Sequence, residues 1–128
     1  WAGEVARMAG VDLPLGTWTH DVLLIRSPEE VGSHPVVIDD ALSMYFRMET
    51  GGLTLVALED GNRFDEAPEA PLDRVAADFV ERAVERICRR IPGMEGGSMQ
   101  SAYCGRDGVT PDQRPILGPA GPEGFYLA

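Results

Sequence analysis

Tyr45 and Arg47 are the two side chains in this sequence best suited to hold a small ligand. They lie in residues 43–49, where apolar and polar side chains alternate, and this pattern predicts a strand with one covered face and one open face. Both fall on the open face, where a phenol and a planar guanidinium together suit the carboxylate of a small amino acid. The alternative is that Arg47 faces solvent and pairs with Glu49 or Glu59.

Other chemistry finds little support in the sequence. His20 and His34 stand alone, and no spacing of histidines, cysteines and acids resembles a metal site. The acid pairs Asp39-Asp40 and Glu59-Asp60 are adjacent strand residues that point to opposite faces, so we expect solvated strand ends rather than a general acid and base. A role for His20 facing a cavity remains the alternative to an ordinary strand position.

The sequence also lacks lysine and the glycine-rich turn of dinucleotide-binding proteins. All 11 basic residues are arginine, so no lysine can act as a Schiff base or general base. A bound dinucleotide needs a Gly-x-Gly-x-x-Gly turn that opens a helix, because backbone donors there meet the pyrophosphate. No such turn occurs, so we expect that these residues alone cannot complete a dinucleotide site.

The composition excludes several kinds of partner. The chain has 128 residues, with 21 acidic and 11 basic side chains and a net charge of -10. Nucleic acids and anionic membranes both need a basic face, so neither is expected to bind. No apolar run approaches the roughly 18 residues of a membrane helix. Cys88 and Cys104 are too few for a disulfide framework, so a cytoplasmic, reduced setting is expected.

The periodicity along the chain predicts an α+β fold: an antiparallel sheet of about four or five strands packed on one long helix. A short helix is expected over residues 1–9, with Gly10 at its C-terminal cap. Residues 63–72 are expected to be an irregular linker. The predicted strands are 17–26, 35–39, 43–49, 53–58 and 98–105, the last broken by Arg106-Asp107-Gly108.

The long helix is predicted over residues 74–91. Apolar side chains recur there at helical spacing and form one stripe, while arginines and acids fill the opposite stripe. Asp73 is the predicted N-cap, and Pro92-Gly93 ends the helix. A helix of about 18 residues is about 27 Å long, and its apolar stripe needs a sheet to lie on.

The C-terminal part of the chain is predicted to be an extended connector. Four prolines each fix φ and remove a backbone donor, and several glycines permit conformations that other residues avoid, so no helix can pass through. A short apolar strand is expected over residues 124–128. The prolines are Pro111, Pro115, Pro119 and Pro122.

This connector resembles a segment of the flavin-dependent amine oxidoreductases of the D-amino acid oxidase superfamily. The likeness rests on Thr110-Pro111-Asp112 followed by Pro115-Ile116-Leu117-Gly118-Pro119. It is closest to sarcosine oxidases, dimethylglycine dehydrogenases and glycine oxidases. Trp1-Ala2-Gly3 and the segment from Tyr45 to Gly52 are also similar to these families. The generic alternative is a proline-rich loop before an edge strand.

The resemblance implies that the chain is a fragment containing the substrate-binding, or cap, domain of an FAD-dependent oxidoreductase. Residues 1–10 would be a helix leaving the flavin-binding domain, 11–108 the substrate domain, and 109–128 the connector and strand that return. FAD would be bound mainly by parts of a longer parent chain. Tyr45 and Arg47 would border the substrate cavity. The residues implied to lie near the cofactor are Gly105, Thr110, Pro111 and Asp112.

The resemblance also implies the reaction. A small secondary or tertiary amine, such as sarcosine or dimethylglycine, would transfer a hydride from the carbon next to its nitrogen to the flavin, while the protein orients the substrate. The fragment alone would be inactive and colourless, and neither a catalytic residue nor an oligomeric state is predicted. The competing hypothesis is a non-catalytic α+β domain that binds a protein partner through exposed strand edges. A related flavoenzyme for D-amino acids or a sugar phosphate is a third option.

Cys104 raises the question of a covalently attached flavin. In some monomeric sarcosine oxidases a cysteine just before the same Thr-Pro-Asp tethers the cofactor, and by that count it would fall at Gly105. A shift of one residue on a strand reverses the face to which the side chain points. We therefore expect non-covalent FAD. Cys88 lies on the apolar stripe of the predicted helix and is expected in the core.

Overall fold

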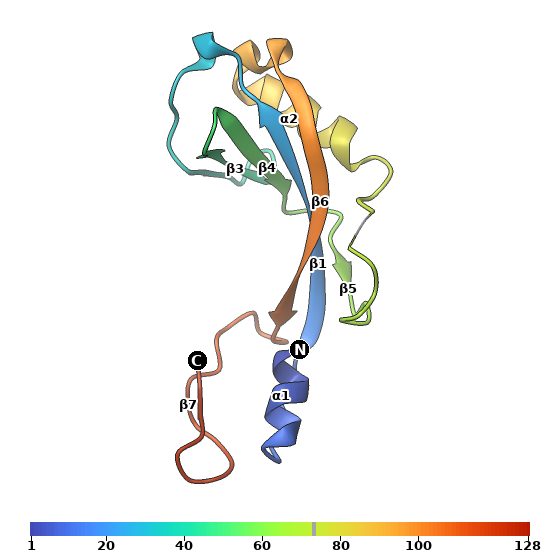
Figure 1. The fold of residues 1–128 in the computed structure, drawn as a ribbon, viewed down its shortest axis with the longest axis vertical. Coiled ribbons are helices and arrows are strands. Elements are labelled where there is room, and N and C mark those ends of the chain that lie inside the picture. Colours follow the sequence, from blue (N-terminus) through green and yellow to red (C-terminus); the bar gives the residue numbers. More distant parts are fainter. Residues whose placement is uncertain (73) are drawn as a thin grey trace. The chain divides into compact units, whose positions relative to one another are not determined.

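The computed structural model describes residues 1–72 and 74–128 and has mixed helices and strands (Figure 1). The α+β prediction is therefore confirmed, whereas the predicted N-cap Asp73 lies outside the described residues. The elements in chain order are α1 (Ala2–Met8), β1 (Gly16–Arg26), η1 (Glu29–Val31), β2 (Val37–Asp39), β3 (Met44–Glu49), β4 (Leu53–Leu58), β5 (Arg63–Phe64), α2 (Phe79–Arg90), η2 (Pro92–Gly96), β6 (Ser98–Val109), β7 (Gly118–Pro119) and β8 (Tyr126–Leu127), where η denotes a short 3-10 helix.

The chain divides into two units that we describe separately. Unit 1 comprises residues 1–18, 63–70 and 106–128, and unit 2 comprises residues 19–62 and 71–105. Strands β1 and β6 contribute residues to both. The domain boundaries expected from the sequence remain a prediction.

The main sheet has six strands in the order β2-β3-β4-β1-β5, and β6 also pairs with β1. The pairs β2 with β3, β3 with β4 and β4 with β1 are antiparallel, as predicted. The hairpin between β3 and β4 turns on Gly51 and Gly52, which both have a positive φ that glycine adopts without steric cost. The sheet exceeds the expected strand number because β5 lies within the predicted linker.

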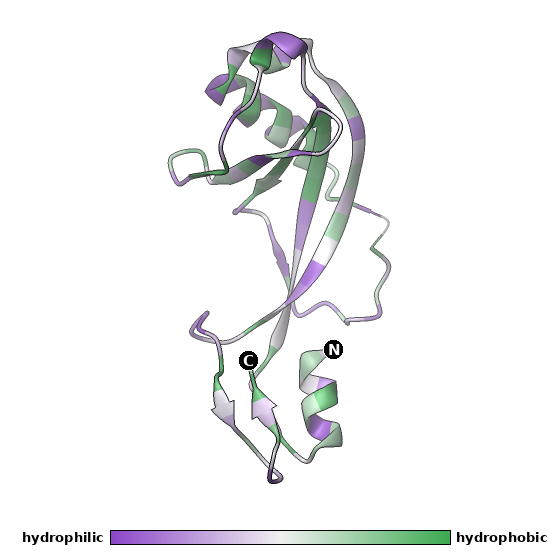
Figure 2. Ribbon diagram, turned by 60° about the vertical axis from the view of Figure 1, so that its left-hand side comes forward, coloured by the Kyte–Doolittle hydropathy of each residue, from purple (hydrophilic) through white to green (hydrophobic). Residues whose placement is uncertain are grey.

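Helix α2 packs on one face of the unit 2 sheet (Figure 1). The strands beneath it carry hydrophobic residues, whereas α2 itself mixes hydrophobic and hydrophilic ones (Figure 2). The predicted alternation of β3 is confirmed, since Met44 and Phe46 are buried in this core. The buried core consists of Leu23, Ile25, Met44, Phe46, Val56, Leu58, Phe79, Ala83, Ile87 and Met94.

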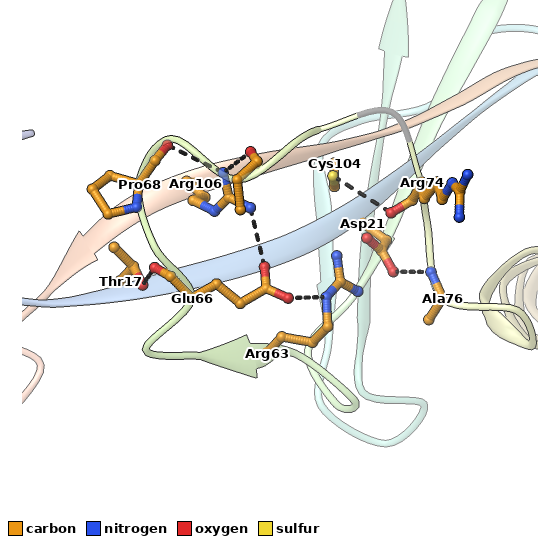
Figure 3. Close-up of polar contacts among 10 residues, drawn as sticks. Thr17, Asp21, Arg63, Glu66, Pro68, Arg74, Ala76, Cys104 and Arg106 are labelled. Atoms are coloured by element: carbon orange, nitrogen blue, oxygen red, sulfur yellow. Dashed lines mark hydrogen bonds and ion pairs between the residues drawn. The ribbon is translucent and has the colours of Figure 1, made fainter.

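Helix α2 has 12 residues and begins at Phe79, so the prediction that it starts at residue 74 is wrong. The backbone before it is bonded to side chains of the sheet instead (Figure 3). The N–H of Ala76 donates to Oδ2 of Asp21 at 2.9 Å, and Sγ of Cys104 donates to the carbonyl of Arg74 at 3.7 Å. These tertiary contacts satisfy the Ala76 N–H, and also the Arg74 carbonyl that a longer helix would have paired within itself. Long-range bonding thus outweighs the local helical pattern here.

Strand β6 continues to Val109, so the predicted break at Arg106-Asp107-Gly108 is also wrong. Arg106 is nine-tenths buried, and its guanidinium donates to the carbonyls of Pro68 and Ala70 and to Oε2 of Glu66 at 3.2 Å (Figure 3). A charged side chain is tolerated in a strand when its donors are satisfied in this way.

Unit 1 contains α1 and the β7-β8 pair. The predicted end of α1 is confirmed: Gly10 has φ of 74°, and its N–H and that of Val11 donate to the carbonyls of Arg7 and Ala6. Strand β8 lies within the apolar strand predicted near the C-terminus and pairs antiparallel with β7. Within the described residues, no helix has the length and apolar character needed to cross a membrane.

Candidate functional site

The face of the unit 2 sheet that points away from α2, here called the open face, presents Tyr45. Strand pairing places Tyr45 opposite Ala57, and Ala57 opposite Val22, so the three form one row across β3, β4 and β1. Paired residues of an antiparallel sheet point to the same side. Tyr45 is half-buried and packs against a small apolar cluster made of Val22, Leu24, Leu55 and Ala57. This cluster gives the open face an apolar floor next to Tyr45.

Arg47 lies in the next row of the open face, opposite Leu55. Its Nη2 lies 2.6 Å from Oε1 of Glu49, and the Arg47 side chain is 50% exposed. The alternative considered from the sequence, an Arg47–Glu49 ion pair, is therefore present. A guanidinium has five N–H donors, so one contact leaves others for a ligand.

His20 lies on the same open face, a placement that the sequence reasoning did not bring out. It precedes Val22 by two residues on β1, so its side chain points to the side on which Tyr45 lies. A Cβ built on Gly105 would stand 3.3 Å from Nε2 of His20, so β6 also reaches this position. The open face thus carries an imidazole, a phenol and a guanidinium.

The residues expected near the cofactor fall in both units. Gly105 belongs to unit 2, whereas Thr110, Pro111 and Asp112 belong to unit 1. In unit 1 a tight turn is closed by two side chains: Oγ1 of Thr110 donates to the carbonyl of Arg114 at 2.8 Å, and Oδ1 of Asp112 accepts the N–H of Arg114 at 3.2 Å. The backbone of the connector is therefore held in a defined shape.

Unit 1 also contains a hollow of about 870 Å³ beside this turn. Its walls are mostly apolar and come from α1, Trp18, the turn at Thr110 and the C-terminal residues 125–128. No glycine-rich turn opening a helix occurs in the described residues, so a dinucleotide's pyrophosphate finds no cradle here. That FAD is held mainly by other parts of a longer parent chain remains a prediction. Within the same residues, no three metal-ligating side chains gather at one point.

Arg86 of α2 fixes the loop that leads into β3 and the site. Its two terminal nitrogens each lie 2.7 Å from an oxygen of Asp60, and Nη1 also donates to the carbonyls of Leu42 and Ser43. The hydrogen bond from Arg86, with the charges of Arg86 and Arg82, holds the pKa of the Asp60 carboxyl below its usual value despite some burial. Folding thus favours the ionised form of Asp60.

We expect this pair to give stability that depends on pH. Since the folded-state pKa of Asp60 is lowered, the stabilisation is fully present above its ordinary value of 3.8 and is lost as pH falls through the lowered pKa. Asp60 is partly exposed, so the effect should be on the order of 1 kcal/mol after screening. Urea unfolding of Asp60→Asn across pH 3 to 7 should show a deficit at neutral pH that shrinks in acid. A deficit that does not change with pH would contradict the assignment; Asp40→Asn is the control.

The comparisons with known proteins place this chain in a family. A family model described as "DAO: FAD dependent oxidoreductase" matches residues 1–128. The chain therefore belongs to the FAD-dependent oxidoreductase family. The resemblance drawn from the sequence is confirmed.

Among relatives, the mitochondrial sarcosine dehydrogenase of Mus musculus is 32% identical over 136 residues, which cover 99% of this chain and 14% of the relative. Among solved structures, L-proline dehydrogenase from P. horikoshii has a TM-score of 0.78 at 19% identity, and glycine oxidase from Geobacillus kaustophilus 0.73 at 21%. The match to L-proline dehydrogenase covers 94% of this chain and 32% of that protein, and the match to glycine oxidase covers 96% and 31%. Both matches show a shared fold. The chain spans about 14% of the length of the curated relative. The cytoplasmic setting expected from the cysteine content remains a prediction.

Proposed function

We propose that this chain is the substrate-binding part of an FAD-dependent oxidoreductase that oxidises a small amine or amino acid resembling sarcosine or dimethylglycine. The observation that carries the proposal is the family match over all 128 residues. The relative named sarcosine dehydrogenase supports the choice of substrate class. In the intact protein the fragment would lie against a flavin-binding domain of the parent chain, with residues 1–10 and 109–128 as the connections.

The open face would bind the substrate. Arg47 would donate to its carboxylate, since a guanidinium recognises that group in a planar, charge-assisted manner. The phenol of Tyr45 would supply a hydrogen bond above the apolar floor, which excludes water from beneath the substrate. His20, on the same face, would be a second polar contact. Bound FAD would supply the chemistry by accepting a hydride from the carbon next to the nitrogen.

Non-covalent binding of FAD agrees with the position of Cys104. Its side chain is 4% exposed and donates to the carbonyl of Arg74, so Sγ points to the α2 side of the sheet rather than to the open face. Gly105 next to it has no side chain to offer a tether. Thr110, Pro111 and Asp112 would adjoin the cofactor through the shaped turn that they form.

The proposal is tested on the full-length protein that contains this chain. We expect a purified yellow protein whose flavin is released into the supernatant on acid precipitation. A screen of N-methylglycine, N,N-dimethylglycine, proline, D-alanine and glycerol 3-phosphate should show flavin bleaching with an N-methylated glycine under anaerobic conditions. A colourless protein would contradict the proposal. Bleaching by D-alanine or glycerol 3-phosphate alone would reassign the substrate class.

A second candidate function, binding of a protein partner without catalysis, has one observation in its favour. β2 is the last strand in the order β2-β3-β4-β1-β5, and Val36 just before it and Ile38 within it are each 70% exposed. An edge strand with exposed apolar side chains is a common template for pairing with another chain. The family match favours the enzyme, and the flavin content of the full-length protein distinguishes the two.

A further inference from the structure

We infer that Glu49 determines which carboxylated amines the open face accepts. By neutralising part of the positive charge there, it would favour a substrate with one carboxylate and disfavour one with two. This inference rests on the proposed function of Tyr45 and Arg47. It adds a selectivity residue that does not itself need to touch the reacting carbon.

The geometry puts Glu49 directly beside the proposed carboxylate ligand. Both residues lie on β3 two positions apart, so their side chains point to the same face. Their charged groups approach to 2.6 Å, and the Glu49 side chain is only 29% exposed. Neither side chain has another polar partner among the described residues.

The charge of this corner of the face can be counted. Arg26 is the next cation, because it pairs with Leu53, which in turn lies opposite Glu49. Its guanidinium donates to neutral oxygens, those of the Gly51 carbonyl at 3.0 Å and the Gln100 amide at 3.2 Å. Two arginines and one glutamate leave a net charge of +1, which matches a single substrate carboxylate.

A substrate carboxylate on Arg47 would therefore sit next to the carboxylate of Glu49. One such group is acceptable, because the unused N–H donors of Arg47 and the charge of Arg26 offset it. A second carboxylate on the same substrate would meet Glu49, and the described residues of β1, β3 and β4 offer no arginine on this face beyond Arg47 and Arg26. Replacing Glu49 with glutamine keeps the shape and raises the local charge to +2, so the penalty should disappear.

The test compares N-methylglycine with iminodiacetate, which adds a second carboxylate to the same amine. In flavin-loaded full-length Glu49→Gln, we expect the ratio of kcat/KM for iminodiacetate to that for N-methylglycine to rise about three- to tenfold at low salt, the range of a partly screened charge contact. The matched control is Glu59→Gln, an exposed acid just after β4, which should leave the ratio unchanged. Flavin content and absorbance spectrum verify that each variant is folded.

Binding of inhibitors gives a second measurement that does not depend on turnover. In Glu49→Gln, the ratio of the inhibition constant of malonate to that of acetate should fall by a similar factor. An unchanged malonate-to-acetate ratio, in a protein where Arg47→Ala still raises KM, would overturn the role of Glu49 and leave the proposed function standing. If Arg47→Ala changes no KM, or if neither amine is oxidised by the wild type, both the site and this inference are wrong.

Discussion

Arg47→Ala in the full-length flavoprotein should raise KM for the amine substrate by well over tenfold. The variant loses a charge-assisted contact to the substrate carboxylate, worth about 1.5 to 3 kcal/mol. The contact is made in both the ground state and the transition state, so kcat should fall much less than kcat/KM. The measurement is steady-state kinetics with N-methylglycine. The flavin content of Arg47→Ala is measured as well, so that its kcat is compared with that of the wild type per bound flavin.

The position of Arg47 allows a sharp control. Its side chain is half-exposed and its structural partner is Glu49, so truncation should cost little stability. Arg89→Ala removes an equally charged, exposed arginine from α2, on the other side of the sheet, and should leave KM unchanged. An unchanged KM in Arg47→Ala would remove this residue from the substrate site. Equal rises in both variants would indicate a loss of overall charge rather than of a specific contact.

The sequence predicted this part of the site well because the relevant pattern is local. The alternation of residues 43–49 has a period of two, so it assigns Met44 and Phe46 to one face and Tyr45 and Arg47 to the other without knowledge of the partner strands. The same spacing puts Arg47 and Glu49 on one face, so their pairing is also an alternative that the sequence alone offers. The alternation cannot give the neighbouring strand, so His20 stands alone in the sequence although strand pairing puts it on the face that carries Tyr45.

The errors lie where distant segments decide the local conformation. Arg106 was expected to break a strand, yet its guanidinium is satisfied by carbonyls 36 and 38 residues away. Arg63-Phe64 was expected in a linker, yet it forms a short strand at the end of the sheet order, where Phe64 stacks on Trp18 with ring centroids 6.3 Å apart. No composition or periodicity within either segment encodes these partners.

The start of α2 is the clearest such case and can be tested. Asp21 is only 5% exposed, and its carboxylate accepts the N–H of Ala76 from 55 residues away. We expect Asp21→Ala to destabilise the protein by about 2 to 3 kcal/mol, since a hydrogen bond to a charged group is lost and a partly buried donor is left without its acceptor. Urea unfolding measures this free energy, with the exposed Asp40→Ala as the matched control.

The same variant should change the boundary of the helix. With the Asp21 carboxylate gone, the bond from Cys104 to the carbonyl of Arg74 remains, but the N–H of Ala76 is released. The apolar stripe that begins at Val75 can then join the helix, because its local preference is helical. Hydrogen exchange should then show slower exchange of the amides at 79–82, whose carbonyl partners lie in 75–78, although global stability has fallen. Faster exchange throughout 76–82 would instead mean that Asp21 organises the whole segment. In that case residues 74–78 would have no helical preference for the bond to Asp21 to oppose.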